Sequence, residues 1–153
     1  MPKKVEVFLI ALASPIQIGI YENGKLIEKI ESYEKSSEIL PTLFEKILKK
    51  HTLKALYYAN GPGSFMAIKV AYLFLKSLSI LKKIPFFATD AFKFNKNMPI
   101  KAIGKLCFVK IASEIKTQKL ETVPEVNFIL PDVLDYNEFS KNAAPLYMIG
   151  AVG

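Results

Sequence analysis

Three residues in a predicted strand-to-helix turn offer the clearest candidate for ligand chemistry. Gly61 and Gly63 flank a proline, and Ser64 stands directly before an apolar helical pattern. Glycine permits close backbone approach and a helix start offers free N–H groups, so this loop could cradle a phosphate or nucleotide. No Lys-Ser or Lys-Thr pair follows the glycines, as it would in a P-loop. A tight structural turn uses the same residue types, and this plainer interpretation stays open.

The other titratable residues do not form a catalytic set. His51 is the only histidine and follows Lys49 and Lys50, where positive charge suits the end of a helix. Metallopeptidase sites and most catalytic triads therefore lack their parts. Asp90 follows a predicted strand, and an N-cap is its commoner role there. Cys107 is the only cysteine, so the chain forms no internal disulfide, which fits the reducing cytoplasm.

The composition indicates a basic protein with a core. The chain has 153 residues, a formal net charge of +7 and 51% hydrophobic residues. Positive charge attracts RNA, anionic membranes or acidic proteins, and does not choose among them. Glu6 interrupts the one apolar run that imitates a signal peptide. No uncharged apolar stretch approaches the roughly 20 residues that a membrane span needs. We therefore expect a cytoplasmic protein that does not enter a membrane.

Hydrophobic periodicity predicts the order β-β-β-α-β-α-β over the first two thirds of the chain. The predicted elements are strands over 5–12, 16–21 and 25–33, a helix over 37–50 capped by Ser36 or Ser37, a strand over 55–60, a helix over 64–83 capped by Ser64, and a strand over 85–89. This order is the core of the ribonuclease-H-like α/β fold, which actin-like ATPases also use. Further strands are predicted over 102–111 and 126–130, with an extended piece at 145–147.

The helix predicted over residues 64–83 is too apolar to pack on one sheet alone. Its polar side chains form one narrow stripe, made by Lys69, Tyr72, Lys76 and Ser79. The apolar arc covers roughly 240°, whereas packing on one surface needs about 100°. Either a partner protein covers the excess or the last third of the chain does. If a partner covers it, Phe74→Asp should break association and leave the monomer folded.

Short motifs resemble the TsaB (YeaZ) family. The strongest is Gly61-Pro62-Gly63-Ser64-Phe65, which resembles the family's Gly-Pro-Gly-Ser-Phe-Thr-Gly-Leu-Arg signature. Residues 36–41 resemble a family helix start, and Ala144-Pro145-Leu146-Tyr147 resembles its C-terminal Pro-Leu-Tyr. Met66 and Ala67 replace the Thr-Gly of the signature, and Lys69 takes the place of its basic residue. The resemblance covers about the first 95 residues and the tail, with a shorter region between.

The resemblance implies a non-catalytic relative of TsaD in the actin-like ATPase superfamily. It implies an N-terminal subdomain, residues 1–98, and a shortened C-terminal subdomain, residues 99–153. Its partners would be TsaD and the ATPase TsaE, which form threonylcarbamoyladenosine in tRNA, with tRNA contacted only through the complex. Family members associate, as homodimers or with TsaD, through two helices that correspond to 37–50 and 64–83. The interface residues so predicted are Leu40, Leu43, Phe44, Ile47, Met66, Val70, Leu73 and Phe74.

Two departures from the family pattern favour a chain without its own catalysis. The stretch Ala11-Leu12-Ala13-Ser14 lacks the acid that ends the first strand in active relatives. Residues 90–94 lack the histidines that hold a metal in TsaD-like enzymes. We expect no cofactor and no metal in this chain, with ATP bound at most by the complex. Two alternatives stay open: an enzyme of the superfamily, glycoprotease-like or a small-molecule kinase, and an RNA-binding module.

Overall fold

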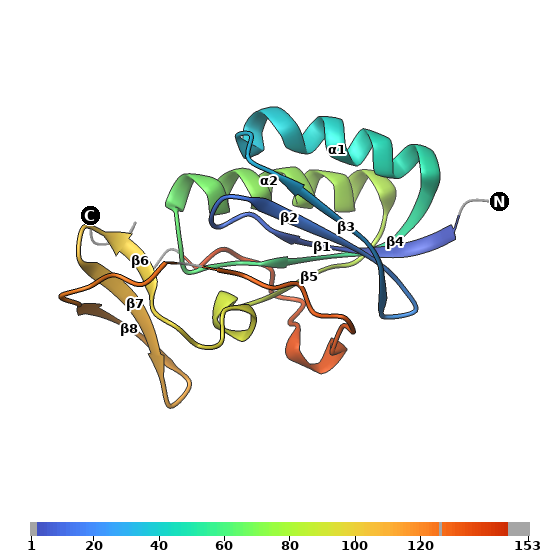
Figure 1. Cartoon of the computed structure of the whole chain (residues 1–153). Helices are drawn as coiled ribbons and strands as arrows, with labels where there is room; N and C mark the ends of the chain where they lie inside the picture. Colours follow the sequence, from blue (N-terminus) through green and yellow to red (C-terminus); the bar gives the residue numbers. More distant parts are fainter. Residues whose placement is uncertain (1–2, 126, 147–153) are drawn as a thin grey trace.

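The computed structural model describes residues 3–125 and 127–146, and its centre is a five-stranded mixed sheet (Figure 1). Its strands are β1 (Lys3–Ile10), β2 (Ile16–Glu22), β3 (Lys25–Ser32), β4 (His51–Ala59) and β5 (Phe86–Thr89). They lie in the order β3-β2-β1-β4-β5. The pairs β1–β2 and β2–β3 are antiparallel, whereas β1–β4 and β4–β5 are parallel. The predicted order of strands and helices in this part of the chain is confirmed.

Burial of each strand follows its position in the sheet. β1 from Val5 to Ile10 is buried throughout, because layers of structure cover both faces of this central strand. β3 lies at the edge of the sheet and alternates exposed with partly buried residues. Asn23 and Gly24, both with positive φ, make the predicted hairpin turn between β2 and β3.

Helices α1 (Ser36–Lys50) and α2 (Phe65–Lys82) lie side by side on one face of the sheet (Figure 1). The rings of Phe44 on α1 and Phe74 on α2 meet edge to face, with centroids 5.1 Å apart. Both helices share a core cluster with the apolar residues of β1, β2 and β4. The buried helix residues are Leu40, Phe44 and Ile47 on α1, and Ile68, Ala71, Leu75 and Leu78 on α2.

The two helices begin differently. The prediction for α2 is confirmed, since the Ser64 side chain accepts a hydrogen bond from the backbone N–H of Ala67 at 3.4 Å. The prediction for α1 is wrong, because Ser36 is already helical and the N-cap residue is Lys35, without a side-chain cap bond. His51 closes α1 as predicted, since it is the C-cap residue and donates its backbone N–H to the Ile47 carbonyl. Its extended backbone also begins β4.

The opposite face of the sheet is covered by two short 3-10 helices and the end of the chain. The first 3-10 helix is η1 (Ala91–Phe94). The second, η2 (Tyr136–Glu138), belongs to residues 127–146, which we call the C-terminal segment. The C-terminal segment runs beneath the sheet, opposite the helices (Figure 1). Its Phe128, Leu130 and Leu134 join a second core cluster with side chains of β1, β2 and β4. The predicted strand over 126–130 is wrong for residues 127–130, which form no strand; Val126 and Tyr147 lie outside the described residues.

A second sheet stands beside the main one (Figure 1) and consists of β6 (Ile100–Ile103), β7 (Leu106–Ile111) and β8 (Glu114–Lys119). The single strand predicted over 102–111 is wrong, because a turn at Gly104, with φ of 57°, divides it into β6 and β7. The division into subdomains at residue 98 stays a prediction. Beyond the second sheet, the C-terminal segment returns to the main sheet and pairs Val133 with Lys25.

Candidate functional site

A cavity of about 540 Å³ opens where the chain enters both helices. Its lining comes from the β1–β2 loop (11–16), the β3–α1 loop (33–37) and the start of α2. The polar groups on its wall include Ser14, Lys35 and Ser64, and Glu34 is its one acidic residue. The cavity combines a few polar groups with apolar walls, which is the usual character of a ligand site.

The predicted phosphate loop contributes only one residue to this cavity. Ser64 lines it, and its hydroxyl is already engaged by the N–H of Ala67. Gly61 has φ of 124°, and a Cβ there would lie 3.1 Å from both Ile68 Cδ1 and the Leu146 carbonyl oxygen. A Cβ on Gly63 would lie 3.2 Å from Leu12 Cβ. Both glycines therefore serve close packing against protein atoms.

The backbone around Gly61 binds other parts of the chain. The Gly61 carbonyl accepts the N–H of Ala91, at the start of η1, at 2.8 Å. Asn60 receives the N–H of Leu146 on its carbonyl and donates its side-chain amide to the Ala144 carbonyl at 2.9 Å. The loop thus anchors the C-terminal segment, which accounts for its conformation without a bound anion.

The outer face of α2 presents an apolar row at heptad spacing. Met66, Leu73 and Ile80 lie seven residues apart and are 62%, 53% and 65% exposed. Val70 and Ser77 fall between them, so the row follows the alternating three- and four-residue steps of a helix–helix contact. We call these five residues the α2 seam. At 1.5 Å per residue it extends about 20 Å along the helix.

The structure separates the predicted interface residues into two groups. Leu40, Phe44 and Ile47 are at most 2% exposed, so their side chains pack inside the chain. Leu43, Val70 and Phe74 are partly buried against the first core cluster. Met66 and Leu73 are exposed. Ile80, which was not among the interface residues predicted from the sequence, is exposed at the same spacing along the helix.

The isolated titratable residues serve structural contacts. Asp90 caps η1 by accepting the N–H of Phe92 at 3.0 Å, as predicted, and also pairs with Lys110 at 2.8 Å. Cys107 is buried in β7. The His51 side chain is only 11% exposed, and its Nε2 lies 4.0 Å from Glu28. Among the residues that the structure describes, no three His, Cys, Asp or Glu side chains gather as metal ligands would.

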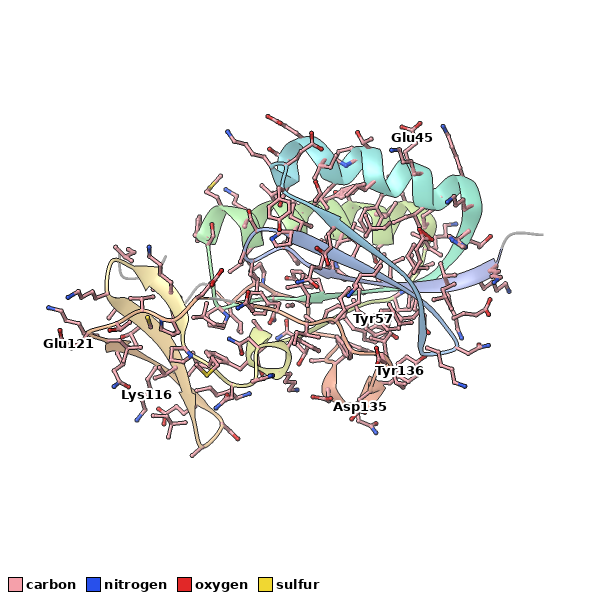
Figure 2. The ribbon with its side chains drawn as sticks, viewed as in Figure 1. Glu45, Tyr57, Lys116, Glu121, Asp135 and Tyr136 are labelled. Atoms are coloured by element: carbon pink, nitrogen blue, oxygen red, sulfur yellow. The ribbon has the colours of Figure 1, made fainter. Side chains whose placement is uncertain are left out.

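One buried carboxylate was not recognised from the sequence. Glu6 in β1 is 3% exposed and accepts the N–H of Gly24 at 2.9 Å and the hydroxyl of Tyr136 at 2.7 Å. Figure 2 shows Tyr57 and Tyr136 close together beneath the sheet, and the Tyr57 hydroxyl lies 3.5 Å from the same carboxylate. Burial, and then the Glu6 carboxylate, raise the pKa of Tyr57 above its usual value and that of Tyr136 to about 12. A lone acid inside an apolar strand was the available signal for this group.

No described helix is both long enough and apolar enough to cross a bilayer. The fold is a mixed α/β sheet of order 3-2-1-4-5 with two helices on one face. Among solved structures, YeaZ from Pseudomonas aeruginosa is similar, with a TM-score of 0.57 and 12% identity, over 76% of this chain and 65% of that chain. An uncharacterized protein with similarity to the peptidase YEAZ from Pseudomonas aeruginosa is also similar, with a TM-score of 0.53 and 13% identity, over 76% and 64%.

These similarities establish a shared fold with YeaZ and nothing finer. The chain spans slightly less than two thirds of the length of either structure. No protein-family profile matches the sequence, and no curated protein matches it.

Proposed function

We propose that this chain is a non-catalytic, TsaB-like docking subunit whose α2 seam binds a partner protein. The observation that carries the proposal is the exposed apolar row of Met66, Leu73 and Ile80. Burying a large aliphatic side chain contributes roughly 1.5–3 kcal/mol, so covering three of them supplies a substantial part of a binding free energy. The shared fold with YeaZ supports a TsaB-like assignment.

The rest of the described chain does not cover the seam. The C-terminal segment, which was the other candidate cover, packs on the opposite face of the sheet (Figure 1). α1 lies against one flank of α2 through the Phe44–Phe74 contact and leaves the seam exposed. Lys69 and Lys76 are exposed along its other border. A partner that fits would offer an apolar helix face with acidic residues at the side that meets these lysines.

The partner we propose is a TsaD-type catalytic subunit, with a second copy of this chain as its substitute when TsaD is absent. On this account the chain belongs to the actin-like ATPase superfamily and acts with TsaD and TsaE in forming threonylcarbamoyladenosine in tRNA. Catalysis then resides in TsaD, and this chain carries no cofactor of its own. The Ala11–Ser14 loop supports this view, since it brings no acid to the cavity.

An enzyme of the same superfamily is the alternative, and the 540 Å³ cavity is the observation that favours it. Calorimetric titration of this chain with a TsaD-type subunit from the same source distinguishes the docking function from the enzyme. The docking proposal predicts binding that Leu73→Asp weakens at least about 100-fold, or roughly 3 kcal/mol. Ile129→Asp, a change at a 57% exposed residue of the C-terminal segment, is the matched control and should leave binding intact. Equal binding by wild type and Leu73→Asp, together with nucleotide or peptide turnover by the chain alone, would favour the enzyme.

A further inference from the structure

The positive charge of the chain is concentrated in residues 91–120. This stretch contains seven of the 21 basic residues and one acidic residue, Glu114. Its formal charge is therefore +6, against +7 for the whole chain, and the remainder is nearly neutral. A charge concentrated in this way creates a local positive potential that an evenly spread charge does not.

The fold places most of this charge on the second sheet. We call residues 96–119, which include β6, β7 and β8, the lysine-rich sheet. Its exposed lysines are Lys96, Lys101, Lys105, Lys116 and Lys119. Figure 2 shows Lys116 on this sheet, away from the helices. No residue of β8 is buried, so this edge strand is open to an approaching ligand.

Acidic neighbours neutralise only part of the lysine-rich sheet. Lys110 pairs with Asp90 at 2.8 Å and is not among its exposed lysines. Lys105 lies 3.9 Å from Glu121 and Lys116 lies 3.6 Å from Glu114, but all four side chains are more than half exposed. Ion pairs of this kind are screened and contribute little. Lys96, Lys101 and Lys119 have no acidic group within 4.0 Å among the residues described.

The residue types favour a phosphate backbone over other anionic partners. Lysine ammonium groups bind phosphates as point charges and need no fixed geometry. A membrane surface would need one apolar patch beside the charge, yet the exposed Ile103 and Ile111 are far apart on the sheet. Ile103 ends β6 and pairs with Leu106 at the start of β7, whereas Ile111 is the last residue of β7. The one aromatic residue of the three strands, Phe108, is buried and cannot stack on bases.

We propose that the lysine-rich sheet binds the phosphate backbone of nucleic acid without reading its sequence. This surface is distinct from the α2 seam, so the proposal does not rest on protein docking. If the chain contacts only phosphates, its affinity should depend strongly on salt. Nucleic acids of equal length and different sequence should then bind with equal affinity.

Fluorescence anisotropy with the full chain and a labelled single-stranded RNA of about 16 nucleotides tests the proposal. Binding at about 50 mM salt should fall steeply toward 200 mM, and a DNA strand of the same length separates RNA from general phosphate recognition. The triple variant Lys101→Gln, Lys116→Gln, Lys119→Gln should lose at least about tenfold in affinity, and its log–log salt slope should fall by about 2. Binding of the RNA alone supports the proposal, and so does binding of both the RNA and the DNA oligonucleotide.

A matched control removes three lysines from the surface of α1: Lys46→Gln, Lys49→Gln and Lys50→Gln. These residues are exposed, and the formal charge falls by the same amount. Equal losses from the two triple variants would overturn the proposal, as would undetectable RNA binding by wild type. Displacement of bound RNA by phosphatidylserine vesicles in preference to unlabelled RNA would overturn it as well. Lys96→Glu, which lies outside the strands, provides a second test should the triple variant unfold.

Discussion

Tyr136 donates a hydrogen bond of 2.7 Å to the buried carboxylate of Glu6, 130 residues earlier in the chain. The contact joins η2 to the central strand β1. Similar side-chain contacts attach other points of the C-terminal segment, since Gln17 donates to the Phe128 carbonyl and Tyr21 to the Pro131 carbonyl, both at 2.7 Å. The C-terminal segment is therefore part of the main fold.

Removing the hydroxyl of Tyr136 tests the energy of this contact. Tyr136→Phe deletes a hydrogen bond to a charged acceptor, so the free energy of unfolding should fall by about 1–3 kcal/mol. Urea denaturation measures the change. The control is Tyr33→Phe, because the Tyr33 side chain is 78% exposed, and it should change stability by less than about 0.5 kcal/mol. Equal effects of the two variants would show that the Glu6 contact contributes nothing.

Stability should fall at alkaline pH. Burial raises the pKa of Tyr21, Tyr57 and Tyr136, helped by Asp132 near Tyr21 and by Glu6 near the other two. A raised pKa means that the folded state favours the protonated phenol. This contribution is complete below the unfolded value of about 10 and is lost as pH rises through the folded values. Tyrosinate absorbance of the folded chain should rise at higher pH than that of the urea-unfolded chain, because at least Tyr21, Tyr57 and Tyr136 ionise late. Identical titration curves for the folded and the unfolded chain would contradict this.

The C-terminal segment should contribute to the core as strongly as a central element. Leu134 is 3% exposed, so Leu134→Ala should lower the free energy of unfolding by about 2–5 kcal/mol. Its neighbour Val133 is 60% exposed, and Val133→Ala should cost less than about 1 kcal/mol. Thermal and urea unfolding of the pair give the comparison. A Leu134→Ala protein as stable as Val133→Ala would mean that the segment is not packed in solution as described.

Gly61 should tolerate no side chain. It combines a positive φ with close contacts to Ile68 and Leu146, so Gly61→Ala should destabilise the chain by at least about 1–3 kcal/mol. Gly104 also has a positive φ, but a Cβ there would meet no atom within 4 Å. Gly104→Ala should therefore show only the backbone cost of about 1 kcal/mol. Equal losses would remove the packing argument for Gly61.

Substitution by aspartate should have different effects at two adjacent residues of α2, because one side chain is packed and the other is exposed. Phe74 packs on Phe44, so Phe74→Asp should unfold the chain, contrary to the expectation from the sequence. Leu73 is 53% exposed, and Leu73→Asp should leave the chain folded. Circular dichroism of the two purified variants separates these outcomes. A folded Phe74→Asp protein would restore the original prediction.

The N-terminal two thirds were predictable because periodicity, turn and cap signals agree there. Asn23-Gly24 and Ser64 each specify one local geometry, and the apolar runs have the lengths of strands and helices. The last third was not predictable, since its contacts are long-range. Nothing local to Leu134 or Tyr136 indicates that they pack on β1 and β2. β8 has a single apolar residue, Ile115, so no alternation marks it as a strand.

The helix that carries the candidate docking surface was predictable from the sequence, but the residues that it exposes were only partly predictable. The apolar excess of α2 was visible on a helical wheel, but the wheel does not say which flank α1 covers. That flank decides between Phe74, which is covered, and Leu73, which is not. The sequence of the glycine-rich loop did not distinguish a structural turn from an anion site, because tight packing and anion binding both require residues without side chains.

The most direct test of the account is the mass of the particles that the chain forms in solution. Size exclusion coupled to light scattering should be run on wild type and Leu73→Asp, each alone and mixed with a TsaD-type subunit. If the α2 seam is a docking surface, the wild-type chain of 17.2 kDa should form a dimer alone and a mixed complex with TsaD, and Leu73→Asp should stay a folded monomer in both cases. A wild-type monomer that ignores TsaD, or a Leu73→Asp chain that associates as wild type does, would contradict the claim that the α2 seam is a docking surface.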